Sequence, residues 1–259
     1  MKPPPAFRTA LLAGTLLLAG SNVPAATPRE TFLAAKQTAI DANFRNDQTG
    51  LRAAIATFEG LATDPELGAR ARYHAAWTGW MLTASFLQDQ KTPDAIAALE
   101  SGITQLRRVL AADPDEPEAH ALLGWMLQAL VYTDRARMPE LAPQFREHRQ
   151  RALALAPHNP RAVMLDATSL LYSPQPEMQQ QGLARWQETL ALLAAEKVDD
   201  PTRPDWGRTL AEGWLANLYL FLKPPRVAEA RALVEKALRE RPDWWWAKTQ
   251  VLPKTAVKP

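Results

Sequence analysis

The side chains best suited to chemistry are spread along the chain and form no catalytic motif. No two of the four histidines have the i, i+4 spacing that places two imidazoles on one helical face to bind a metal. The absence of cysteine excludes thiol catalysis, thiolate-bound zinc, iron–sulfur clusters and disulfides. Glycine-rich phosphate loops and the G-x-S-x-G nucleophile motif are also missing. The sequence therefore predicts no catalytic residue, no metal and no cofactor, and we expect a protein that is not an enzyme.

Aromatic side chains are the other candidates, because nine tryptophans is a large number for 259 residues. One Tyr and two Trp share a helical face within residues 66–90, where packing between helices is the simpler interpretation. Trp244, Trp245 and Trp246 are consecutive, and successive helical residues point about 100° apart, so the three cannot all face one core. This run predicts either a short helix that caps the fold or, at Trp245 and Trp246, a docking site for another protein.

The first 25 residues have the layout of a secretory signal peptide. Lys2 and Arg8 precede a twelve-residue apolar run, Thr9–Gly20, and small residues at Val23–Ala25 offer a cleavage site. We expect residues 1–25 to be removed and the mature protein to be periplasmic, with no lipid anchor because no Cys follows the leader. The net charge of +2 is too small to indicate nucleic-acid binding. Nothing after residue 26 is long and apolar enough to predict membrane insertion after cleavage.

The spacing of 22 prolines against 11 glycines predicts the helices. Proline is expelled from helix interiors, so long proline-free stretches delimit candidate helices. The first stretch breaks at the polar cluster 46–50 and therefore holds two helices. Alternating β-branched runs are missing, and Ala and Leu dominate. The sequence predicts an all-α fold of ten helices, within 29–64, 66–92, 94–113, 118–138, 144–156, 161–173, 177–200, 205–223 and 226–241.

A repeat becomes visible at the ends of these stretches. Similar segments end at the prolines at positions 65, 114, 157, 201 and 242, which lie 41 to 49 residues apart, about two helices each time. Since one helix pair cannot bury its own apolar face, consecutive pairs are expected to stack with one continuous core. We predict a right-handed α-solenoid of about five antiparallel helix pairs over residues 26–247, followed by a flexible basic C-terminal tail at 248–259.

The repeat resembles the tetratricopeptide repeat (TPR) family in a divergent form. One second helix carries the small–large–small pattern Ala230, Val234 and Ala237 with its terminal Pro242, and one first helix carries the Leu123–Gly124 pair. The resemblance implies a scaffold that binds peptides, proteins or occasionally small molecules in a concave groove. In the family register the groove positions are Phe86, Trp125, Gln128, Leu165, Tyr172, Leu215 and Tyr219.

The interpretation is a noncatalytic periplasmic interaction module that binds a partner protein or peptide of the cell envelope. An alternative is a component of a periplasmic transport system that binds a small hydrophobic ligand. A closed cavity lined by Trp125, Tyr172 and Tyr219 would favour the ligand, and an open groove would favour the scaffold. A further alternative is a cell-envelope glycan-acting enzyme, which needs two carboxylates flanking an aromatic cleft.

Overall fold

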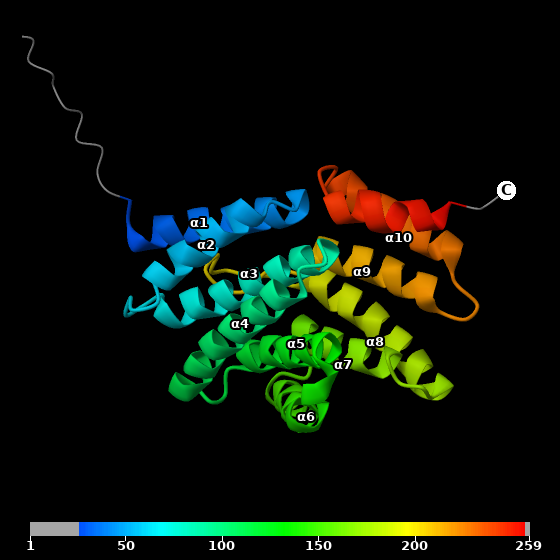
Figure 1. Ribbon diagram of the computed structural model, residues 1–259, viewed down its shortest axis with the longest axis horizontal. Coiled ribbons are helices and arrows are strands. Elements are labelled where there is room, and N and C mark those ends of the chain that lie inside the picture. Colours follow the sequence, from blue (N-terminus) through cyan, green and yellow to red (C-terminus); the bar gives the residue numbers. More distant parts are fainter. Residues whose placement is uncertain (1–25, 257–259) are drawn as a thin grey trace, which may run out of the picture.

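The computed structural model describes residues 26–256, and within them the chain forms ten α-helices and no strand. Consecutive helices pair as α1 with α2, α3 with α4, α5 with α6, α7 with α8, and α9 with α10 (Figure 1). The all-α prediction and the five helix pairs are confirmed, whereas the predicted leader lies outside the described residues. The helices are α1 (Pro28–Arg45), α2 (Gln48–Gly60), α3 (Gly68–Gln88), α4 (Thr92–Ala112), α5 (Pro117–Thr133), α6 (Met138–Leu155), α7 (Pro160–Leu171), α8 (Pro176–Ala195), α9 (Arg208–Phe221) and α10 (Val227–Glu240).

Local sequence signals set most of the helix starts. Thr27 caps α1 in a reciprocal capping box with Glu30, and the Asp47 side chain accepts hydrogen bonds from the first amides of α2. Helices α4 to α8 each carry a proline in the first turn, where its missing N–H costs least. Pro143 is the exception, because it lies inside α6. The helix predicted to begin at 144 therefore begins at Met138 and tolerates the loss of one backbone hydrogen bond.

One continuous hydrophobic core runs from α1 to the C-terminal segment. Each pair packs on the next through α2 and α3, α4 and α5, α6 and α7, and α8 and α9. Trp77, Trp186, Phe32 and Phe58 are the bulkiest apolar side chains among those that are fully buried in it. This nearest-neighbour stacking is the arrangement that a helical-repeat array requires, because every pair covers the apolar face of its neighbour. None of the helices in the described part of the chain is long and apolar enough to cross a membrane.

The array curves until its two ends meet. The ring of Phe44 in α1 lies 5.4 Å from the ring of Trp244, centroid to centroid, and the Arg241 guanidinium covers the same Phe44 ring at 4.0 Å. Arg241 also forms an ion pair of 3.0 Å with Asp41. In Figure 1 the blue α1 and the red end of the chain accordingly lie on the same side of the molecule. The five pairs thus form a closed ring, with the first helix of each pair toward its inside.

The C-terminal segment belongs to this closure. Residues Ala247–Val251 and Leu252–Thr255 form two short helical turns that contact α10, and the side chains of Val251 and Thr255 are buried. The prediction of a flexible tail beginning at residue 248 is wrong for the residues up to 256. The physical reason is the burial of Val251, an apolar residue that packs against the last helix pair and anchors the segment.

Candidate functional site

Three first helices, α3, α5 and α9, carry the same apolar stripe. Each has a partly exposed Trp, then a small or aliphatic residue four positions later, and a large exposed apolar residue seven positions later. The i, i+4, i+7 spacing places each trio on one face of its helix. The stripes are Trp80, Ala84 and Leu87 on α3; Trp125, Ala129 and Tyr132 on α5; and Trp214, Leu218 and Phe221 on α9.

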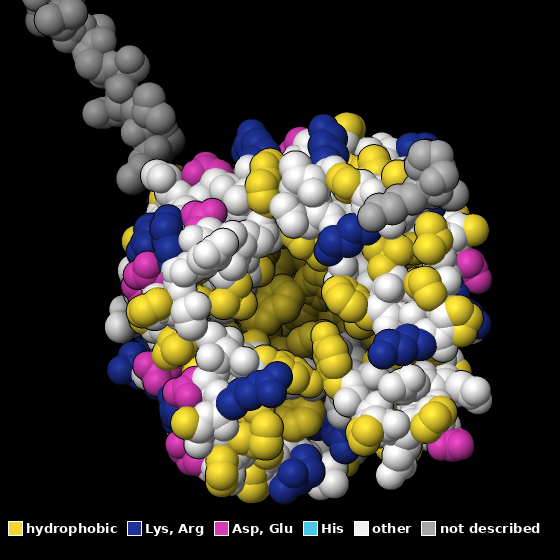
Figure 2. All heavy atoms as spheres, turned by 45° about the vertical axis from the view of Figure 1, so that its right-hand side comes forward, with side chains coloured by type: hydrophobic (Ala, Val, Ile, Leu, Met, Phe, Trp, Pro, Cys, Tyr) yellow, Lys and Arg dark blue, Asp and Glu magenta, His cyan; other side chains and the backbone are white. Residues whose placement is uncertain are grey.

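The three tryptophans meet inside the ring. The Trp80 ring lies 5.1 Å from that of Trp214 and 6.0 Å from that of Trp125, and Trp125 lies 6.1 Å from Trp214. Seven helical residues rise about 10 Å, so the exposed ends of the stripes stand about that far from the indoles. Figure 2 shows a hollow lined by apolar side chains in this face. We call it the apolar cup, with the three indoles as its floor and Leu87, Tyr132, Tyr172 and Phe221 as its rim.

The rim concentrates the exposed apolar side chains of the described residues. Tyr172, the C-cap residue of α7, joins the rim because its ring lies 5.2 Å from that of Tyr132. Large exposed apolar side chains normally occur singly on a surface, and a contiguous group of them marks a binding site. The exposed fractions are 43% for Leu87, 49% for Tyr132, 57% for Tyr172 and 69% for Phe221, and Met138 is the other large apolar residue that is similarly exposed.

The N-terminal halves of the first helices are covered by the chain itself. The connection from α8 to α9, residues 196–207, crosses them, and we call it the strap. The Lys36 ammonium in α1 donates to the carbonyl oxygens of Pro201 at 2.7 Å and Arg203 at 2.9 Å, and pairs with Asp205 at 2.8 Å. Lys36 is buried, so these three acceptors replace its water. The strap thereby occupies half of the inner face and leaves the cup in the other half.

An aromatic pair holds the strap to α3. The Trp206 indole stacks on Trp77 at 5.7 Å with an interplanar angle of 22°, and its Nε1 donates to the Tyr73 hydroxyl at 2.9 Å. All three side chains are buried. Burial raises the pKa of the Tyr73 phenol well above its ordinary value, so the hydroxyl stays neutral and free to accept this hydrogen bond. Tyr73 and Trp77 therefore serve packing, as the simpler interpretation of this face of α3 predicts, whereas Trp80 on the same predicted face is only partly buried.

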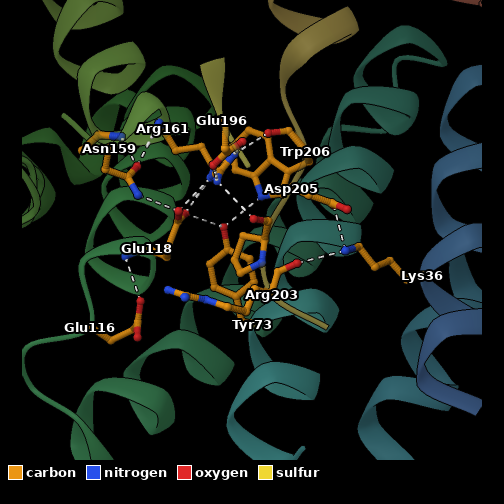
Figure 3. A network of polar contacts seen from close by, with 12 residues as sticks. Lys36, Tyr73, Glu116, Glu118, Asn159, Arg161, Glu196, Arg203, Asp205 and Trp206 are labelled. Atoms are coloured by element: carbon orange, nitrogen blue, oxygen red, sulfur yellow. Dashed lines mark hydrogen bonds and ion pairs between the residues drawn. The ribbon is translucent and has the colours of Figure 1, made fainter. Parts of the chain in front are cut away.

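Arg161 fastens the strap to α5 and α7 (Figure 3). Its Nε donates to both carboxylate oxygens of Glu118, at 2.8 and 2.9 Å, and its Nη atoms pair with Glu196 and donate to the carbonyl oxygens of Trp206 and Pro204 at 2.7 and 3.1 Å. Burial is the largest single influence and lowers the pKa of Arg161, but Glu118, Tyr73 and Glu196 together outweigh it and raise that pKa above its usual range. Only 1% of Arg161 is exposed, so this buried cation is stabilised by its partners alone.

A polar cleft of about 470 Å³ lies beside the strap, on the side of this network. Its lining mixes both charge signs, with Arg70 and Arg203 facing Glu116 and Asp200. Burial raises the pKa of the Glu116 carboxyl. Glu118 and Glu196 are already paired with Arg161, and Asn159 Nδ2 donates to Glu118 at 2.6 Å. Their geometry serves to hold the strap, and the described residues contain no cluster of His, Asp and Glu arranged to bind a metal.

Two of the seven predicted groove residues, Trp125 and Tyr172, lie on the cup. The other five are buried and do not line the cup, because neighbouring positions point about 100° apart on a helix and these positions are offset from the ones that face inward. Leu87 and not Phe86 reaches the rim, and Trp214 and not Leu215 reaches the floor. The exposed fractions of the five are 3% for Phe86, 8% for Gln128, 0% for Leu165, 1% for Leu215 and 6% for Tyr219.

A signal for the missed residues is present in the sequence. The dipeptide Gly-Trp occurs at 79–80, 124–125 and 213–214, each time followed seven residues after the Trp by a large apolar residue. Two of these glycines are needed for close packing, since a Cβ on Gly213 would overlap the Trp244 ring and one on Gly124 would meet Leu165 at 2.6 Å. The Trp after each glycine is turned by about 100° from these contacts and points toward the inside of the ring.

The C-terminal tryptophans close the ring. Trp244 is buried, and its ring lies 5.6 Å from that of Trp246, which is half-buried. Trp246 also lines a pocket of about 220 Å³ together with Trp80 and Trp214. Part of the run therefore caps the core. Docking of a partner at Trp245 and Trp246 stays a prediction.

Comparison with known proteins identifies the fold. No protein-family model and no curated protein sequence matches this chain. Among solved structures, the HusA haemophore from Porphyromonas gingivalis matches with a TM-score of 0.56 and 20% identity, covering 74% of this chain and 90% of HusA. A thermophilic TPR protein from Thermus thermophilus matches with a TM-score of 0.55 and 17% identity, covering 88% of this chain and 98% of that protein. The chain thus has a divergent TPR-like helical-repeat fold.

Proposed function

We propose that this protein is a noncatalytic binding protein of the periplasm that holds an apolar ligand in the apolar cup. The observation that carries the proposal is the convergence of Trp80, Trp125 and Trp214 under a rim of exposed apolar side chains. Aromatic rings supply a large apolar contact area at low conformational cost, as binding sites require. The periplasmic location is supported by the signal-like composition of residues 1–25.

The shape of the site favours a ligand over an extended peptide. A peptide that runs along a TPR groove needs the full length of the inner face, but the strap covers the N-terminal halves of the first helices. The contact between α1 and the C-terminal segment closes the ring at its seam. What remains is a blind hollow suited to a compact ligand. HusA, a protein of similar fold, is named as a haemophore, which supports the same class of function.

A partner protein is the second candidate, and the wide exposure of Phe221 and Tyr172 at the rim favours it. A partner would insert one apolar side chain or a chain terminus into the cup and cover the rim residues. Such a contact would use the cup residues as anchors, in the way that interface hot spots use aromatic pockets. This candidate predicts that the isolated protein binds small apolar molecules weakly and with no defined stoichiometry.

Binding of the uncharged fluorophore N-phenyl-1-naphthylamine tests the proposal, because its emission rises in an apolar site. We expect saturable binding of one molecule per chain, with quenching of Trp emission by energy transfer. Ala129→Phe fills the middle of one stripe and should weaken binding at least tenfold. Ala154→Phe, at an exposed position on the second helix α6, should leave binding unchanged. Unsaturable binding, or equal affinities for the two variants, would overturn the proposal.

A further inference from the structure

The mouth of the apolar cup is basic. Arg135 follows Tyr132 by three residues, Lys223 follows Phe221 by two, and the Lys254 ammonium lies 5.9 Å from the centroid of the Phe221 ring. Figure 2 shows Lys and Arg side chains around the hollow, with Asp and Glu mostly further out. The chain as a whole is nearly neutral, with 30 basic and 28 acidic residues. The positive charge at the mouth is therefore a local feature of this opening.

These three cations lack acidic partners among the described residues. Two other basic residues in the same loops are paired, Arg137 with Glu100 at 2.7 Å and Arg226 with Glu229 at 4.0 Å. Two acids that follow rim residues in the sequence have contacts of their own. Asp89 pairs with Lys91, and Asp134 accepts a hydrogen bond from the Ala136 amide. Three cations without a partner thus remain beside an apolar opening.

We propose that the ligand is an amphipathic organic anion, whose apolar body fills the cup while its anionic group meets Arg135, Lys223 and Lys254 at the mouth. The inference rests on the proposed function and adds the chemical class of the ligand. The rim stands about 10 Å from the indole floor, so a ligand that reaches the floor carries its charged end at the level of these cations. Attraction between charges persists over about one Debye length at physiological ionic strength, so cations at that level attract the anionic end. Electrostatic steering also speeds the entry of an anion.

Two probes with the same aromatic body separate charge recognition from apolar binding. 1-Anilinonaphthalene-8-sulfonate carries a sulfonate, and N-phenyl-1-naphthylamine lacks it. The triple variant R135E/K223E/K254E should lower the affinity for the sulfonate probe at least tenfold and change that for the neutral probe less than twofold. For the unmodified protein, added NaCl should weaken binding of the sulfonate probe only.

A control triple variant with the same change in net charge is R108E/R146E/R239E, whose exposed arginines lie on the second helices α4, α6 and α10. It should leave both affinities within twofold. If the mouth variant and this control affect the sulfonate probe equally, the inference is overturned while the proposed function stands. If neither probe binds the unmodified protein, the proposed function itself fails. Should the mouth variant not fold, R135Q/K223Q/K254Q replaces it, with a loss of at least threefold for the sulfonate probe expected.

Discussion

Loss of the Arg161 cation is expected to be costly, because it leaves the Glu118 carboxylate with too few partners in the core. The Glu118 side chain is only 9% exposed and would keep Asn159 and the Tyr73 hydroxyl as its contacts. Removing one member of a buried ion pair typically costs about 3–5 kcal/mol. For a chain of this size that corresponds to a fall in melting temperature of roughly 6–20 °C. We therefore expect Arg161→Met to be severely destabilising.

Urea unfolding followed by circular dichroism measures this cost directly. The matched control is Arg151→Met, since Arg151 pairs with Asp115 at a site where the two side chains are 48% and 64% exposed. Exposed pairs of this kind contribute about 0–1 kcal/mol. The double variant R161M/E118M removes both charges and should recover a large part of the loss, because apolar replacement of a whole buried pair is often close to neutral.

A second assay reports on the strap itself. Lys197 lies in the strap and is exposed, so trypsin can cleave after it once the strap opens. Arg161→Met should accelerate this cleavage, and Arg151→Met should not. The reasoning is refuted if R161M costs less than about 1 kcal/mol, the range of an exposed pair, or if cleavage after Lys197 is as slow as in the unmodified protein. Either result would mean that the strap stays in place without its buried ion pairs.

Two further predictions concern the core. Burial among aromatic rings lowers the pKa of His74 from 6.5 to about 3. As the pH falls, His74 is protonated at about pH 6.5 in the unfolded chain but only at about pH 3 in the folded chain. The free energy of unfolding is therefore unaffected by His74 above pH 6.5 and decreases by about 1.4 kcal/mol per pH unit between pH 6.5 and pH 3. Urea unfolding of His74→Phe should lack this dependence on pH, whereas the control His158→Phe, at an exposed site, should keep it. The same pH dependence in the two variants would contradict the prediction. In Gly213→Ala the new methyl group overlaps the Trp244 ring, and the free energy of unfolding should fall by about 1–3 kcal/mol. The control Gly60→Ala has open space around its methyl group and should change the free energy of unfolding by less than about 0.5 kcal/mol. Similar melting temperatures for the two variants would contradict this prediction.

The sequence by itself determined the helices and their pairing. Helix ends depend on nearby residues, such as the Thr27 cap and the prolines of the first turns, so their signals are local. The recurrence of Pro-terminated segments indicated two helices per repeat, and stacking of the pairs follows because each must cover an apolar face. Pro143 shows the limit of the rule, because a packed helix outlasts one missing hydrogen bond.

The tertiary structure decided which side chains face the inside of the ring. A helix can rotate about its own axis without changing its sequence pattern, and the contacts of Gly124 and Gly213 with neighbouring side chains fix that rotation. An error of one residue turns a side chain by about 100°, and this is why Phe86 and Leu215 are buried while Leu87 and Trp214 line the cup. Residue periodicity marks the apolar face of each helix but does not divide that face between the core and the inside of the ring.

Closure of the ring and placement of the strap also required the tertiary structure. Each helix pair is rotated slightly against the one before it, and these rotations, accumulated over five pairs, bring the two ends of the array together. The resulting contact between Phe44 and Trp244 joins residues 200 positions apart. The strap likewise pairs its Asp205 with Lys36 of α1 and its Glu196 with Arg161 of α7. The sequence specified the repeated unit through local physics, and the sum of its packing angles decided that the array ends in a closed ring with an apolar cup.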